Sequence, residues 1–460
     1  MIRKGNDEVI KRNTVILFAA FVSIALLVSA CSNNQNKGNA GVVNKDEIVT
    51  ITYWGYAQPE YQQQVEKRVS EVFPNIRLKI TGFPTVTGGG DPIISAAAAG
   101  TLPDLFNSNP TQGSAYSSIG LTQPLSTFED FESVTKDVDQ NLIESGRIEE
   151  GEVHNLIFNG ANSVAMYYNT RLWAEAGLTE ADIPKTWDEL VEVAKKLTKD
   201  TDGDGRIDQY GIEVPTSGIG GGFNFNYGYP LYWSITGSPT DGFISKDGKE
   251  VTVDIPAYAK AIELVSDLVL NHKVAPPERT QDIFPTGTTA MMANGPHMEL
   301  ILNDPNKSRV VDEWDVFPMP TLGLGKATVN YMPVGGRTVM MSKHTKHPEE
   351  AWEVIKFLLS EEGQMLGFNL LGEMPVVKTV YDHPDFQARR TAGIFTSLEN
   401  TEFYARDPYY YSIINNTLSP ALDTVLAGNA SPEDAVKAAV TSLEALVKED
   451  IASQEALYGK

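Results

Sequence analysis

Apolar and polar positions alternate along this chain with periods that predict strands and helices in turn. The apolar run Val164–Asn169 predicts a buried strand, and Thr170–Ala176 predicts a short helix after it. A longer helix is expected from Trp187, with Pro184 and Thr186 as start signals. Its apolar face has the i, i+3, i+4, i+7 spacing of one helix side: Leu190, Val193, Ala194 and Leu197. This stretch therefore predicts a β-α-α segment of an α/β protein.

The N-terminal half repeats the same alternation. Strands are expected at residues 48–54 and 76–80, and helices at residues 60–73 and 92–99. Residues 101–106 are expected to form a tight turn that leads into a third strand. This order predicts a mostly parallel sheet, whose ligands bind at the carboxyl ends of the strands. The loops Gly55–Pro59 and Asn107–Thr111 are therefore expected to meet a ligand. Later helices are expected at residues 254–271, 348–359, 412–426 and 432–446.

The charge balance excludes two classes of partner. The chain has 37 Lys and Arg against 60 Asp and Glu, a formal net charge of −23. Such a surface repels the phosphates of nucleic acids and the headgroups of anionic lipids. We therefore expect no binding to nucleic acid and no membrane contact apart from an anchor.

The N-terminus has the pattern of an export signal. Basic residues ending in Lys11-Arg12 precede the apolar run Thr14–Ala30, which is short for a membrane span. Cys31, the only cysteine, follows directly, and Val28–Cys31 resembles a bacterial lipobox. Residues 1–30 are therefore predicted to be a cleaved signal peptide. Cys31 is predicted to be lipidated, with palmitate as an expected acyl chain, so that the exported protein is anchored to the outer face of the cell membrane.

Two points follow from this N-terminus. The polar residues 31–47 are expected to form a flexible tether between the lipid and the folded chain. An exported chain without a second cysteine has no disulfide, so its stability has to come from its core. The alternative is an uncleaved signal anchor with an incidental cysteine.

The loop Lys199–Gly211 (KDTDGDGRIDQYG) has the spacing of a calcium loop. Aspartates occupy its positions 1, 3, 5 and 9: Asp200, Asp202, Asp204 and Asp208. Arg206 at position 7 would offer its backbone carbonyl, but Gly211 replaces the bidentate glutamate of a complete EF-hand. Four neighbouring carboxylates repel one another without a cation. A structural Ca²⁺ is therefore favoured over a plain acidic turn, and no organic cofactor is expected.

The segment Gly222–Trp233 (GFNFNYGYPLYW) is dense in aromatic and amide side chains and keeps neither the strand period nor the helix period. Aromatic residues at this density often belong to a core. An irregular aromatic and amide loop also suits a sugar, because rings stack on the apolar face of a pyranose and amides pair with its hydroxyls.

The motifs of common enzymes are missing from the sequence. There is no G-x-S-x-G and no H-E-x-x-H, and the glycine-rich segments lack the spacing of a phosphate loop. The predicted ligand loops gather Trp, Tyr, Phe, Asn and Gly rather than Asp and Glu, which favours binding over hydrolysis. The alternative is a secreted surface glycosidase, since the 60 acidic residues offer many pairs of carboxylates.

Several ordered segments together resemble one protein family. They are AAAGTLPDLFNSNP at 97–110, YYNTRLWAEAG and PKTWDEL within 166–197, the DTDGDG loop, 287–298, 316–320, and HPEEAWEVIKFLLSEEGQ from His347. This order is similar to the extracellular solute-binding proteins of carbohydrate ABC importers, the family 1 group that includes maltodextrin-binding protein. The resemblance runs from about Ile48 to the C-terminal helices.

The resemblance implies a type II periplasmic-binding-protein fold, which is α/β with two hinge-linked lobes. Each lobe would be a mostly parallel sheet flanked by helices. The N-terminal lobe would comprise residues 48–163 and 320–374, and the C-terminal lobe residues 164–319 and 375–460. The chain would cross between the lobes at residues 164–169, 316–320 and 373–375.

The resemblance also implies the ligand site. A sugar would lie in the cleft between the lobes, against the following residues: Trp54, Tyr56, Gln58, Asn107, Asn109, Tyr227, Tyr229, Trp233, His297, Gly335 and Arg337. His297 stands where maltodextrin binders carry Trp, which argues against a maltodextrin ligand. The implied mechanism has no catalytic residues. A sugar, expected to be an oligosaccharide, closes the lobes, and the closed, monomeric protein docks on the transmembrane subunits of an ABC permease.

Overall fold

The structure is a computed structural model. It describes residues 47–83, 91–108, 113, 116–147, 151–160, 164–215, 222–237, 243–245, 249–277, 283–326, 337–396 and 416–458.

A five-stranded sheet forms the first lobe, in the order β2-β1-β3-β8-β4. The strands are β1 (Val49–Gly55), β2 (Ile76–Gly82), β3 (Leu105–Ser108), β4 (Asn155–Asn159) and β8 (Arg337–Met341). β1 pairs in parallel with β2 and β3, while β8 runs antiparallel between β3 and β4. Four strands therefore share one direction, and a strand from much later in the chain is inserted among them.

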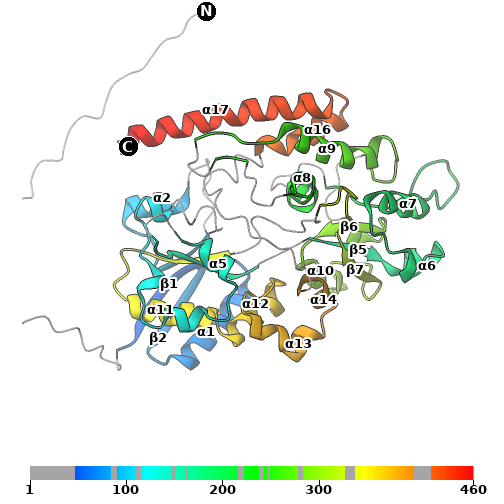
Figure 1. Cartoon of the computed structure of the whole chain (residues 1–460). Coiled ribbons are helices and arrows are strands. Elements are labelled where there is room, and N and C mark those ends of the chain that lie inside the picture. The colour runs from blue at the N-terminus through cyan, green and yellow to red at the C-terminus, as the bar shows by residue number, and fades with distance from the viewer. Residues whose placement is uncertain are drawn as a thin grey trace, which may run out of the picture. The chain divides into compact units, whose positions relative to one another are not determined.

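Helices cover both faces of this sheet (Figure 1). On one face, α1 (Pro59–Val72) and α11 (Pro348–Leu358) pack into the larger core of the lobe. On the other face, α2 (Pro92–Ala99) packs Ile93 against Phe106 and Met340. Further helical segments of this lobe are η1 (Leu125–Thr127), α4 (Phe131–Thr135), α5 (Gln140–Glu144), α12 (Glu361–Leu371), η5 (Lys378–Asp382) and α13 (Pro384–Gln387).

A three-stranded sheet in the order β6-β5-β7 forms the centre of the second lobe. Its strands are β5 (Ala165–Asn169), β6 (Met291–Asn294) and β7 (Trp314–Pro318). β5 is antiparallel to both neighbours, so this sheet differs from the mostly parallel sheet predicted for each lobe. The reason is that β5 follows directly after the first lobe and runs away from it, whereas β6 and β7 run back.

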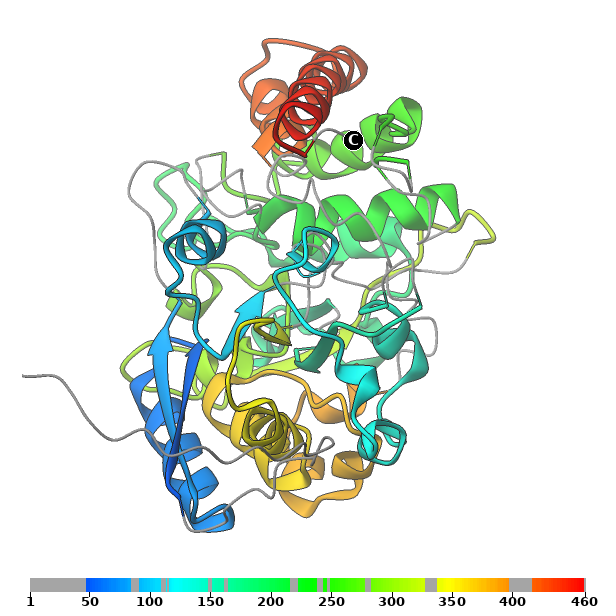
Figure 2. The same ribbon diagram turned by 90° about the vertical axis from the view of Figure 1, so that its left-hand side faces the viewer.

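Helices form the bulk of the second lobe. They are α6 (Thr170–Glu175), η2 (Glu180–Asp182), α7 (Trp187–Leu197), η3 (Asn224–Gly228), α8 (Tyr229–Thr236), α9 (Ile255–Leu270), η4 (Phe284–Thr286), α10 (Met298–Leu302), α16 (Pro420–Leu426) and α17 (Pro432–Tyr458). The predicted start of α7 is confirmed by a capping box, in which Thr186 and Glu189 satisfy each other's backbone N–H groups. Both Figure 1 and Figure 2 show α17 lying over α9 and α16.

Two large hydrophobic clusters follow the two sheets. One cluster joins β1 and β2 to α11 and α12, and the other joins α7, α8, α9, α16 and α17. Val376, Val380 and Phe386 pack in the first cluster, although the sequence assigned residues 375–460 to the C-terminal lobe. Their apolar side chains pack beside α12, so the segment that contains them belongs to the first lobe.

The lobes meet where the chain passes between them. On the side of the first lobe, Gly160, just after β4, donates its N–H to the carbonyl of Met374 at 2.8 Å. Glu299 of α10 is buried and accepts hydrogen bonds from the backbone N–H and the hydroxyl of Thr391. Arg389 stacks its guanidinium over Phe368 of α12 and lies 3.9 Å from the Glu299 carboxylate. Within the described ranges, no helix combines the length and hydropathy needed to cross a bilayer.

Candidate functional site

The carboxyl edge of the first sheet gathers polar side chains from four strands. β1, β3 and β4 all end at this edge, and the antiparallel β8 begins there. The edge therefore carries Tyr56 after β1, Asn107 near the end of β3, Asn159 at the end of β4 and Arg337 at the start of β8. We call these four residues the edge cluster.

Tyr56 lies at the centre of the edge cluster. Its hydroxyl donates a hydrogen bond to Oδ1 of Asn159 at 2.7 Å, and the Arg337 guanidinium lies 5.6 Å from its ring centre. Burial raises the pKa of the phenol well above its usual value, Glu373 raises it further, and Arg337 opposes this. The hydroxyl therefore stays protonated at neutral pH and remains a donor to Asn159.

The two asparagines of the edge cluster are held in the same way. Tyr53 donates its hydroxyl to Oδ1 of Asn107, as Tyr56 does to Oδ1 of Asn159. Both residues are buried, yet within the described part of the chain neither Nδ2 group has a hydrogen-bond partner. Neither Nδ2 atom belongs to the fully buried side-chain atoms that lack a partner, so both are accessible at the sheet edge. The sheet edge thus presents two oriented N–H₂ groups that suit the oxygen atoms of a ligand.

Trp54 and Gln58, which the sequence also predicted to contact the ligand, lie at the end of β1 and in the loop after it. Trp54 is half-buried, and its ring meets that of Phe83 edge-on, with centres 6.3 Å apart. Gln58 is exposed and precedes α1. Asn109 and Gly335, which were also predicted to contact the ligand, lie outside the described residues, as does Cys31.

Sequence reasoning missed Asn159 and Glu373. Asn159 ends the buried strand NLIFN just before Gly160, and a polar residue at the end of an apolar run is a signal that could have revealed it. Glu373 is half-buried and acts electrostatically on the Tyr56 hydroxyl. No local pattern marks Glu373, because its position depends on the turn that follows α12.

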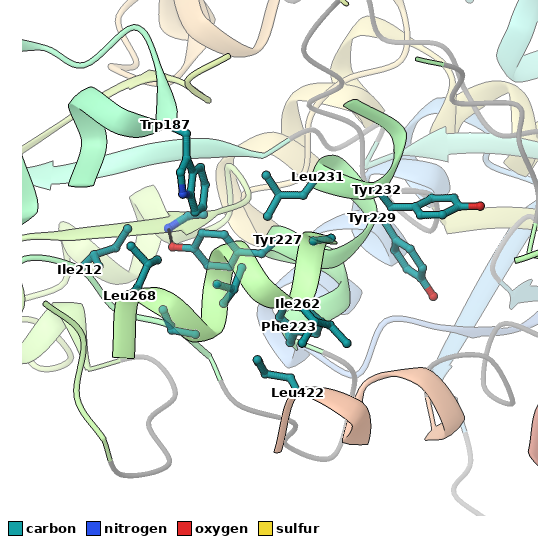
Figure 3. Close-up of a cluster of buried hydrophobic side chains, with 14 of the residues drawn as sticks. Trp187, Ile212, Phe223, Tyr227, Tyr229, Leu231, Tyr232, Ile262, Leu268 and Leu422 are labelled. Carbon is teal, nitrogen blue, oxygen red and sulfur yellow. Dashed lines mark hydrogen bonds between the residues drawn. The ribbon is translucent and has the colours of Figure 1, made fainter. Parts of the chain in front are cut away.

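The aromatic segment of the second lobe does not form the exposed platform that the sequence predicted. Tyr227, Tyr229 and Trp233 are at most 2% exposed. Tyr229 stacks on Trp233 with ring centres 5.5 Å apart, and Figure 3 shows Tyr227 among Trp187, Ile212 and Leu268.

The backbone of this segment explains the burial. Residues 224–236 are helical, through η3 and α8, and the helix turns these rings toward α7 and α9. The Tyr227 hydroxyl is used inside the protein, since it donates to the carbonyl of Glu213 at 2.9 Å. Phe225 and Asn226 are the half-exposed residues of η3. If this segment touches a ligand, these two side chains are available and the three predicted rings are not.

His297 lies at the contact between the lobes. It is half-buried and stands at the start of α10, after the turn that follows β6. A Cβ built on Gly372 would lie 2.7 Å from the Cα of His297, and Gly372 has a φ of +71°. Only glycine fits there. His297 is therefore held against the turn after α12, close to Glu373.

The acidic loop brings three of its predicted ligands together. Carboxylate oxygens of Asp200, Asp202 and Asp208 all lie within 4.8 Å of one another. Two oxygens on one Ca²⁺ are at most about 5 Å apart, so this spacing fits the ion. Asp204 is not part of this group and accepts a hydrogen bond from the N–H of Arg206 at 2.8 Å. Hydrogen bonds from Thr201 lower the pKa of the Asp208 carboxyl, which keeps it ionised.

Solved structures share this architecture, and named relatives are similar in sequence. Maltose-bound MalE3 of T. maritima aligns with a TM-score of 0.69 at 22% identity, covering 86% of this chain and 99% of that chain. A putative binding protein of Brucella abortus is 24% identical over 343 residues, 72% of this chain and 76% of the relative. The galactooligosaccharide-binding protein of Bacillus subtilis is 23% identical over 451 residues, 95% of this chain and 98% of the relative.

A family model settles the class of protein. The model, described as bacterial extracellular solute-binding protein, matches residues 54–365. This match and the named relatives confirm the prediction of binding without chemistry, and nothing in them supports the glycosidase alternative. The structural likeness confirms the predicted two-lobe α/β fold. More than half of the sequence is matched, and the chain belongs to the family of bacterial extracellular solute-binding proteins.

Proposed function

We propose that this protein captures a sugar, and specifically an oligosaccharide, for an ABC importer. The observation that carries the proposal is the pair of Nδ2 groups of Asn107 and Asn159 at the sheet edge. Amide donors fixed by tyrosine hydroxyls suit sugar oxygens, which accept hydrogen bonds from N–H groups. Arg337, paired with Asn159 across β4 and β8, supplies a forked donor. The names of two relatives, a galactooligosaccharide-binding protein and a maltose-bound protein, agree with this class of ligand.

The sugar would act by joining the lobes. The edge cluster would bind it from the first lobe, and Phe225, Asn226 and His297 would approach it from the second. A ligand that contacts both lobes favours the closed form, because it stabilises that form more than the open one. The closed form would then dock on the transmembrane subunits of a permease.

The anchor and the oligomeric state belong to the same proposal. Cys31 would carry the lipid that holds the protein on the outer face of the cell membrane, with residues 32–47 as the tether. The protein would act as a monomer. Mass spectrometry of the membrane-extracted protein would detect acyl chains on Cys31, and an unmodified N-terminal peptide would contradict the anchor.

The acidic loop would hold one structural Ca²⁺ through Asp200, Asp202 and Asp208. The carboxylates fit a hard cation, which prefers oxygen ligands. The loop lies after α7, in the second lobe, so the ion would stabilise that lobe without touching the sugar.

A thermal-shift screen tests the function as a whole. The mature protein would be heated with mono- and oligosaccharides, each with and without Ca²⁺. A sugar that binds the folded protein raises the melting temperature. We expect such a shift with at least one oligosaccharide. The absence of a shift and of calorimetric heat with every sugar would reject the proposal.

A further inference from the structure

A pocket of about 270 Å³ opens on the second lobe, between α7 and the end of α9. Its apolar wall is formed by Trp187 and Val191 of α7 and by Leu264 of α9, which belong to the large core of this lobe or pack against it. Its rim carries charged and polar side chains: Asp188, Glu192, Lys195, Asp267 and His272. The pocket shares no residue with the edge cluster or with the acidic loop.

Trp187 offers an unused hydrogen-bond donor in this pocket. The residue is 5% exposed, and within the described part of the chain its indole Nε1–H has no hydrogen-bond partner. The indole N–H groups of Trp173, Trp314 and Trp352, by contrast, each donate to an oxygen of the protein.

The Nε1–H of Trp187 is accessible from the pocket. The nitrogen is not among the fully buried side-chain atoms that lack a partner, so it reaches open space. Trp187 lines the pocket and is otherwise enclosed, with its ring edge-on to Tyr227, and the N–H therefore faces the pocket. An indole N–H can only donate, so a ligand has to supply an acceptor oxygen.

The charges on the rim favour a cation. Glu192 is already paired, because Lys195 donates to its Oε1 at 2.7 Å. Asp188 is exposed in the first turn of α7 and forms no ion pair with a described residue. Asp267 accepts a hydrogen bond from the neutral Nδ2 group of Asn271 at 2.5 Å. The carboxylates of Asp188 and Asp267 therefore suit an ammonium group, whose hydrogen bonds to carboxylates are stronger than those between neutral groups.

We propose that this pocket binds a small primary amine that also carries a hydroxyl group, at a site separate from the sugar site. The ammonium group pairs with Asp188 and Asp267, and the hydroxyl oxygen accepts the hydrogen bond of the Trp187 Nε1–H. The carbon chain between the two groups lies against Val191 and Leu264. The volume of about 270 Å³ is below the usual range for drug-sized ligands and suits a molecule of this size.

Titration of the mature protein with aminopentanol, followed by NMR of isotope-labelled tryptophan, tests the site. The chain has six tryptophans, and the indole signal that is missing from Trp187→Phe identifies Trp187. This signal should move and saturate as the amino alcohol is added. Pentanediol lacks the ammonium group and should bind at least about tenfold more weakly. Pentylamine lacks the hydroxyl and should bind at least about threefold more weakly.

Asp188→Asn should weaken the binding of aminopentanol by about tenfold, because it removes one charged partner of the ammonium group. Glu349→Gln is the matched control and should leave this binding unchanged. Glu349 is exposed in the first turn of α11 and does not line the pocket. Both variants remove an acidic side chain from the first turn of a helix, so a change in melting temperature that they share does not come from the pocket.

The outcomes separate this site from the proposed function. A Trp187 signal that does not move, an affinity for aminopentanol equal to that for either analogue, or an unchanged affinity in Asp188→Asn overturns the amine site. Competition between aminopentanol and an oligosaccharide would place the amine in the sugar site and also overturn the proposal. A protein that binds aminopentanol as expected but binds no sugar supports the amine site and contradicts the proposed function alone.

Discussion

Two groups of aromatic side chains have similar composition and opposite surroundings. Trp54 and Phe83 stand at the ends of neighbouring strands, where nothing described covers Phe83. Tyr229 and Trp233 stand one helical turn apart in α8, stacked on each other in the core. Side chains at the end of a strand have no neighbouring strand residues beyond them and can remain exposed. Side chains of a helix that is packed between other helices are mostly buried. Aromatic density alone therefore does not identify a sugar site.

The largest effect is expected from the buried pair. Replacing both Tyr229 and Trp233 by Ala removes two core rings, and each such loss costs about 3–5 kcal/mol of the free energy of unfolding. Because the rings touch, the two losses will not add fully. Urea unfolding should show a loss of at least about 4 kcal/mol for the double variant. The contrary outcome is a double variant that keeps wild-type stability and no longer binds sugar. It would mean that Tyr229 and Trp233 form an exposed sugar platform, as the sequence predicted, and that the two aromatic groups do not differ in burial.

Arg337→Ala should affect binding rather than stability. The guanidinium is exposed above Tyr56, and a hydrogen bond from a charged group contributes about 1.5–3 kcal/mol. Sugar affinity should therefore fall by roughly tenfold to a hundredfold, as measured by calorimetry. Arg337→Lys keeps the charge without the fork and should bind with intermediate strength. A large drop in melting temperature with intact affinity would show that Arg337 is structural.

Phe225→Ala tests the exposed part of the second aromatic group. Phe225 is half-exposed in η3 and meets Tyr229 edge-on at 6.2 Å. Removing it should lower sugar affinity by about threefold to tenfold, the contribution of one aromatic contact. An unchanged affinity would mean that the second lobe contributes no aromatic side chain from η3.

The smallest effect is expected at the acidic loop. Ca²⁺ should raise the melting temperature of the wild-type protein by a few degrees, and Asp202→Asn should abolish this shift. Asp204→Asn is the matched comparison and should retain most of it, because Asp204 lies outside the carboxylate group. Differential scanning calorimetry with Ca²⁺ or chelator measures both. If both variants lose the Ca²⁺-dependent rise in melting temperature equally, Asp204 is a calcium ligand as well, as the sequence predicted.

The same loop gives a pH dependence with a definite sign. The pKa of Asp208 is lowered by its hydrogen bonds with Thr201. A carboxylate with a lowered pKa contributes its stabilisation at neutral pH and loses it as the pH falls through the folded-state pKa. The Ca²⁺ shift should therefore persist at pH 7 and disappear in the acid range. A shift that grows toward low pH would exclude carboxylate ligands.

Local pattern was sufficient for much of the fold. The strand 164–169, the cap of α7 at Thr186 and the first three strands follow from periodicity and start signals, and the structure has them. The loops after β1 and β3 were placed at the sheet edge because parallel strands end there. These features depend on residues close together in the sequence.

The remaining features depend on contacts between distant segments. Residues 337–341 enter the sheet between β3 and β4, and no local signal gives that position. Asn159 becomes a site residue only because β8 brings Arg337 beside it. The rings of α8 are buried because Phe243 and helix α9 pack against them, which the irregular pattern of residues 222–233 did not indicate.

The most direct test keeps the tyrosine contacts and replaces each amide donor by a carboxylate oxygen, which accepts instead of donating. Asn107→Asp combined with Asn159→Asp leaves an acceptor oxygen for Tyr53 and Tyr56 at each position. Calorimetric titration with the best oligosaccharide from the thermal-shift screen then compares this variant with Asn306→Asp, a change on an exposed turn. We expect the affinity of the double variant to fall by about a hundredfold, since two hydrogen bonds of about 1–1.5 kcal/mol each are lost. An affinity within threefold of the wild type would contradict sugar binding at this edge.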